Sequence, residues 1–98
     1  MQQALERISK SIRSYAAGDL SKTLAGIELV AAFKVVCKNV GVDVSELQTP
    51  VENYIDSVLV RVGEGGLDEE RAVTELRRVY EAAHNKDANV LAYMARFQ

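Results

Sequence analysis

The stretch Leu24-Ala-Gly-Ile-Glu-Leu-Val-Ala-Ala-Phe-Lys-Val-Val-Cys-Lys-Asn-Val40 decides the fold, because it is the most apolar run of the chain. It is too long for one strand and carries only three charged residues, so it predicts a helix over 20–39, with Gly41 as the residue that stops it. At about 100° per residue, one wide apolar face collects Gly26, Leu29, Val30, Phe33, Val36, Cys37 and Val40. We expect the Phe33 face to pack on the helices before and after it.

A second apolar row lies on the opposite side of this central helix, interleaved with polar residues. It consists of Leu24, Ile27, Ala31 and Val35. An amphipathic surface helix needs only one apolar stripe, so the second row predicts that something covers it. The candidates are the fourth helix, the C-terminal tail and a second copy of the chain.

Apolar residues at helical spacing predict a first helix over 3–17, with Gly18 at its end. Asp19 or Ser21 is then the expected N-cap of the central helix. The sequence Thr49-Pro50-Val51-Glu52 is typical of a capping box and predicts a third helix over 50–62. Asp68 is the expected N-cap of a fourth helix, whose first turn contains two glutamates.

The tail after Asn85-Lys86-Asp87 leaves two arrangements open. Val90, Met94 and Phe97 continue the apolar stripe of the fourth helix, but an unbroken helix would span about 43 Å and overhang a central helix of about 30 Å. Asp87 falls within that stripe and is a good N-cap, which favours a break and a short fifth helix folded back on the bundle. The alternative is an overhang whose apolar side is buried by a second copy.

These patterns predict an all-α fold, a compact antiparallel bundle of four helices plus a short C-terminal fifth helix, in a single helical domain over 1–98. Ninety-eight residues suffice for one core without metal or disulfide.

We find no secretory signal, and no apolar run reaches the roughly 18 residues of a membrane span. With Cys37 as the only cysteine, the expected location is the cytoplasm.

Candidate chemical groups are few. His84 is the only histidine and is expected at a helix end, where a cation suits the dipole. Cys37 is expected in the core, and the acidic pairs fall at helix starts or on a solvent face. Zinc sites need three or four ligands, which this pattern does not provide. We therefore expect no catalytic residue, no metal, no cofactor and no enzymatic activity.

Charge is distributed unevenly along the chain. Residues 1–40 contain six basic and three acidic residues, whereas 41–70 contain eight acidic residues and only Arg61 as a basic one. The basic residues Arg7, Lys10 and Arg13 are interpreted as a solvated face, since the chain as a whole is acidic and has no reading element for nucleic acid. Nucleic acid is therefore not the expected partner.

The first functional hypothesis is a small protein–protein interaction module, such as an inhibitor, immunity protein, phage antagonist or adaptor. Its acidic 41–70 segment would meet a basic surface of another protein. The predicted contact residues share the exposed side of the third helix and its exit: Glu52, Asp56, Val60 and Glu64. The alternative hypothesis is a homo-oligomeric structural subunit that buries either the tail or the second apolar row between copies.

Overall fold

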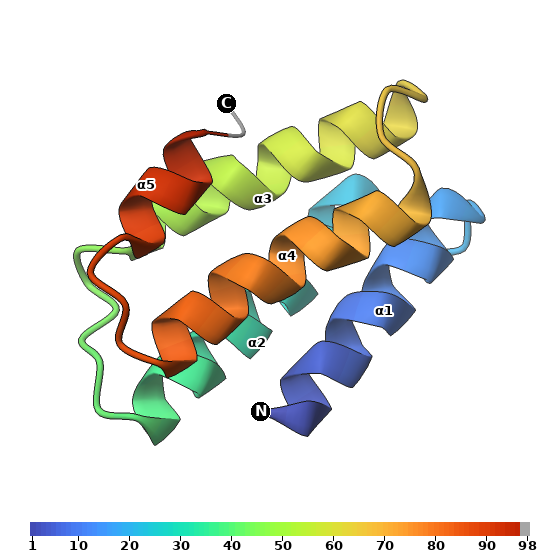
Figure 1. Cartoon of the computed structure of the whole chain (residues 1–98). Coiled ribbons are helices and arrows are strands. Elements are labelled where there is room, and N and C mark those ends of the chain that lie inside the picture. The colour runs from blue at the N-terminus through green and yellow to red at the C-terminus, as the bar shows by residue number, and fades with distance from the viewer. Residues whose placement is uncertain (97–98) are drawn as a thin grey trace.

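The computed structural model describes residues 1–96, and five helices form this part of the chain (Figure 1). Their bounds are α1 Gln2–Ala16, α2 Lys22–Asn39, α3 Gln48–Gly63, α4 Glu69–His84 and α5 Val90–Ala95. The four long helices pack against one another, and the short α5 lies on α3 and α4. The all-α fold of four helices plus a short fifth is thus confirmed.

The four long helices all end in the same local hydrogen-bonded motif. In each, the residue after the C-cap has positive φ, and its N–H and the next N–H bond back to carbonyls of the last turn. Glycine takes this position after α1, α2 and α3, as Gly18, Gly41 and Gly65. Lys86 takes it after α4, with φ 55°.

The helix starts agree only in part with the sequence patterns. Ser21 caps α2, because its Oγ accepts from the backbone N–H of Leu24 at 3.2 Å. Asp68 caps α4 by accepting from the N–H of Arg71 at 2.8 Å. Both are predicted caps, and they fix the direction in which α2 and α4 leave their turns.

The capping box at Thr49 was a wrong prediction. The N-cap position of α3 belongs to Leu47, which is buried and follows a turn closed by its own N–H on the Val44 carbonyl at 2.9 Å. Burial of Leu47 and this turn start α3 two residues early, so Glu52 instead accepts from the side-chain amide of Gln48 at 3.0 Å. Pro50 is still tolerated, since the first N–H groups of a helix have no intrahelical partner.

The core face of α2 packs on α4 as well as on its neighbours in sequence. The Phe33 and Tyr80 rings meet edge to face, with centroids 5.3 Å apart and planes at 74°. The Tyr80 hydroxyl donates to the Leu29 carbonyl. The expectation that the Phe33 face packs on the first and third helices therefore omitted α4, which closes the open side of that face.

The tail folds back on its own chain, as the favoured arrangement predicted. Val90 and Met94 are buried against the bundle, while Phe97 lies outside the described residues. The predicted cap at Asp87 was wrong by two positions, because α5 begins at Val90. Asp87 instead accepts from the Asn89 N–H at 2.8 Å and from the Tyr93 hydroxyl at 3.2 Å, which orders the connection before the helix.

Candidate protein-docking face

The second apolar row of α2, called here the α2 row, stands exposed on the surface. The exposed fractions are 53% for Leu24, 60% for Ile27 and 48% for Val35, and Ala31 between them is also exposed. Helix α4 packs on the core side of α2, and α5 packs on α3 and α4. No part of the described chain therefore supplies the cover that the sequence pattern predicts.

A groove about 570 Å³ in volume runs beside the α2 row, between α2 and α3. Its apolar walls include Gly26 and Val30 of α2 and the buried Ile55 and Leu59 of α3. A Cβ built on Gly26 would meet only the Leu59 Cδ1 atom, at 3.9 Å, so the groove is open above this glycine. We call this the α2/α3 groove.

Charged side chains border the α2/α3 groove on both helices. Lys22 and Lys34 belong to α2, and Glu52 and Asp56 belong to α3. Lys22 Nζ lies 2.9 Å from Asp56 Oδ1, and this hydrogen bond and the carboxylate charge raise the pKa of Lys22. The charge of Asp56 is therefore partly neutralised, whereas Glu52 accepts a hydrogen bond from the neutral side-chain amide of Gln48.

A second groove, about 400 Å³, lies on the other side of the α2 row between α1 and α2. Arg7 and Lys10 of α1 line it, together with Glu28 of α2. The hydroxyl of the buried Ser11 donates to Glu28 Oε2 at 2.8 Å and so joins the two helices. Ile27 and Ala31 line both grooves, so the α2 row is the ridge between them.

The structure brings together two of the four predicted contact residues. Glu52 and Asp56 are exposed at the edge of the α2/α3 groove, close to the α2 row. Val60 is half-buried one turn further on, and Glu64 is exposed as the C-cap of α3, but neither lines this groove. Sequence reasoning did not find Lys22, Gly26 and Lys34 as groove residues, although the second apolar row pointed to this side of α2.

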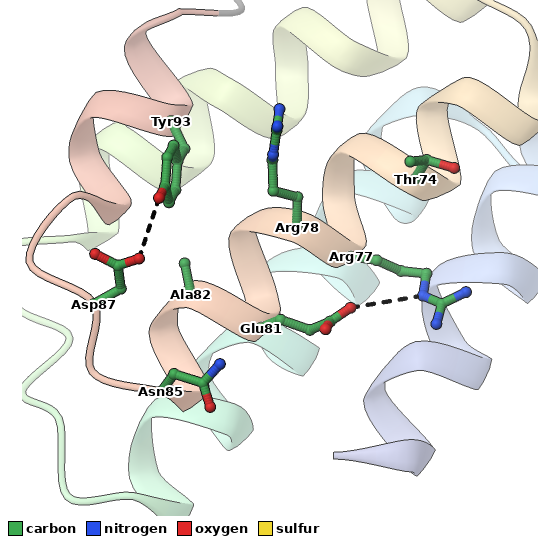
Figure 2. Close-up of a pocket in the computed structure, with 8 residues that line it drawn as sticks. All are labelled: Thr74, Arg77, Arg78, Glu81, Ala82, Asn85, Asp87 and Tyr93. Carbon is green, nitrogen blue, oxygen red and sulfur yellow. Dashed lines mark hydrogen bonds and ion pairs between the residues drawn. The ribbon is translucent and has the colours of Figure 1, made fainter.

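A hollow of about 420 Å³ between α4 and α5 has a different character (Figure 2). Its polar side chains engage one another: Arg77 Nε lies 4.0 Å from Glu81 Oε1, and Tyr93 donates to Asp87. The Arg78 guanidinium carbon is 5.8 Å from the centroid of the Tyr93 ring. The Arg78–Tyr93 contact holds α5 against α4, the Tyr93–Asp87 hydrogen bond ties α5 to its connection, and the Arg77–Glu81 pair lies within α4. These contacts account for the charged side chains and Tyr93 without a ligand.

The remaining chemical candidates lie apart from the α2 row. Cys37 is buried, and burial raises the pKa of its thiol, which disfavours the nucleophilic thiolate. His84 is exposed at the last residue of α4. Within residues 1–96, no three or more His, Cys, Asp or Glu side chains gather in a way that would hold a metal ion.

No helix in the described part of the chain has the length and apolar character needed to cross a membrane. No family model, curated protein or solved structure matches the chain. The α2 row and the two grooves beside it are therefore the candidate functional site.

Proposed function

We propose that this chain is a small non-enzymatic protein–protein interaction module of the cytoplasm, and that it docks through the α2 row and the grooves on either side. The observation that carries this proposal is the exposure of three large aliphatic side chains on one face of one helix. Single exposed aliphatic residues are ordinary, but a contiguous row rimmed by polar residues is typical of an interaction surface.

The free energy available from this face supports docking. Complete burial of a leucine, isoleucine or valine side chain contributes roughly 1.5–3 kcal/mol. Leu24, Ile27 and Val35 are each about half exposed, so covering them contributes roughly 1 kcal/mol apiece before the cost of association. Packing into the adjoining grooves adds to this apolar contribution.

The charges at the groove edges are suited to orienting a partner. Glu52 and Asp56 border one groove, and Arg7 and Lys10 border the other. Charges at the rim of an interface act mainly on association rate and on the choice of partner. An inhibitor, an immunity protein, an antagonist or an adaptor would each use such a face in this way.

The test uses the purified full chain as bait in a native cell extract, in three forms. They are the unaltered chain, Ile27→Lys in the α2 row, and Leu91→Lys as the matched control. Leu91 is an aliphatic residue of α5 with 46% exposure that lies outside the α2 row. We expect that the unaltered chain and the Leu91→Lys variant each retain one protein from the extract, and that the Ile27→Lys variant does not retain it. Its affinity is then measured with purified components, including the bait chain itself as a candidate.

The double change Glu52→Lys with Asp56→Lys tests the acidic edge. We expect weaker binding and a smaller dependence of the affinity on salt, with the helical circular dichroism spectrum unchanged. If no protein, including a second copy of the chain, binds in a manner that depends on Ile27, the proposed function is wrong.

A homo-oligomeric subunit is the second candidate function, and the structure bears on which surface would serve it. Val90 and Met94 of the tail are already buried within their own chain, whereas the α2 row is exposed. The α2 row is therefore the better candidate for an interface between copies.

A further inference from the structure

We propose that a second copy of the chain binds at the α2 face, which consists of the α2 row and the grooves on either side of it. The two copies are related by a two-fold axis parallel to the axis of α2. Each α2 row then lies in the α2/α3 groove of the other copy. This inference rests on the proposed function, because it names the protein that the α2 face binds.

Shape is the first argument for a second copy. A two-fold interface uses the same surface patch on both subunits, so that patch must contain both a projection and the recess that receives it. Here the exposed α2 row and the α2/α3 groove lie side by side and share Ile27 and Ala31. Gly26 leaves the groove open, and the small Ala31 side chain allows a facing helix to come close.

The arrangement of the helices restricts the direction of the axis. On this face α2 lies between α1 and α3, since one groove separates it from each of them. An axis along α2 sets the two α2 helices parallel and places α1 of each copy opposite α3 of the other. An axis across α2 sets them antiparallel and places α1 opposite α1 and α3 opposite α3.

Charge favours the parallel arrangement. On this face α1 contributes Arg7 and Lys10, and α3 contributes Glu52 and Asp56. An axis along α2 brings these unlike charges together twice, whereas an axis across α2 opposes like charges.

Two charges of α2 itself, Lys22 and Glu28, are already bonded to Asp56 and Ser11 within the chain. Lys34 is a third charged residue of α2 at the edge of the α2/α3 groove. Glu52 is hydrogen-bonded to a neutral amide, so its negative charge is available to pair with the basic residues of α1 in the other copy.

Sedimentation of the full chain over a hundredfold range of concentration tests for the second copy. The unaltered chain and the Leu91→Lys control should shift from one to two chains as concentration rises. Ile27→Lys, which alters the projection, and Gly26→Leu, which fills the recess, should both stay monomeric. Ile27 is exposed, so the folded state of that variant, checked by circular dichroism, is expected to persist.

Charge reversal tests the direction of the axis. Reversing α1 with Arg7→Glu and Lys10→Glu, or α3 with Glu52→Lys and Asp56→Lys, should each weaken dimerisation by about tenfold or more. Combining all four changes in one chain should restore it, because unlike charges again face each other in the parallel arrangement. Single reversals without effect, or a fourfold variant weaker than either, would overturn the parallel arrangement.

The two proposals fail separately. A chain that is monomeric at every concentration, or a dimer indifferent to Ile27→Lys and Gly26→Leu, overturns self-association through the α2 face. Retention of a different protein that depends on Ile27 would then leave the proposed function standing.

Discussion

Lys86 occupies the position that ends α4, where the other three long helices place a glycine. A side chain with a Cβ in the left-handed region costs roughly 1–2 kcal/mol, whereas glycine takes this conformation freely. We therefore expect Lys86→Gly to raise the free energy of unfolding by about 1 kcal/mol, measured by urea denaturation. The matched change Gly18→Ala, which places a Cβ at φ 85°, should lower it by a similar amount. No gain in Lys86→Gly would show that this turn is not strained.

Two buried tyrosines predict a loss of stability in alkali. Burial raises the pKa of both Tyr54 and Tyr80 above the ordinary value of 10.0. Above that value the unfolded chain releases protons that the folded chain retains, so the unfolded state binds fewer protons and the free energy of unfolding falls as pH rises. The slope rises through pH 10 and approaches about 1.4 kcal/mol per pH unit for each tyrosine once the unfolded chain is fully ionised.

Urea denaturation from pH 8 to 11 measures this slope. Tyr80→Phe should reduce the slope by about half, and it should also lower stability at neutral pH by about 1 kcal/mol, since the hydrogen bond to the Leu29 carbonyl is lost. A free energy of unfolding that stays constant to pH 11 would contradict the buried placement of both rings.

At the scale of the elements, the caps separate real helix starts from apparent ones. Asp68→Ala removes a side chain that accepts from the Arg71 N–H, so we expect a loss of about 1 kcal/mol. Thr49→Ala, in the sequence that resembles a capping box, should change stability by less than about 0.5 kcal/mol, because Thr49 lies inside α3 and forms no cap there. Thermal or urea denaturation of both variants provides the comparison, and equal losses would contradict the start of α3 at Gln48.

Helix boundaries were predictable where local chemistry alone determines them. Gly18 and Gly41 mark ends in the sequence, and Ser21 and Asp68 mark starts, because each acts through backbone groups a few residues away. The start of α3 was not predictable in this way, since burial of Leu47 against the rest of the bundle determines it. The end of α4 carries no glycine, so the break near Lys86 was predicted from the length of the alternative helix and from Asp87 within its apolar stripe.

At the scale of the whole molecule, the candidate site was predictable as two separate halves. Helical periodicity identified the α2 row and placed Glu52 and Asp56 on an exposed side of the third helix. Their proximity could not be predicted, because it depends on how α2 and α3 pack. The ion pair of Lys22 with Asp56 joins residues 34 positions apart, and no local pattern signals it.

The local motifs that end the helices also have a consequence for the speed of folding. All four long helices terminate through hydrogen bonds within their own last turn, and consecutive helices pack against each other. Helix α4 also packs on α1 and α2, but most contacts of the bundle are local in sequence. Helical bundles of this kind fold in microseconds to milliseconds. We expect stopped-flow refolding of the monomeric Ile27→Lys variant to be nearly complete within the dead time or to follow one fast exponential. The slowest step in forming a functional assembly would then be the encounter of the folded chain with its partner.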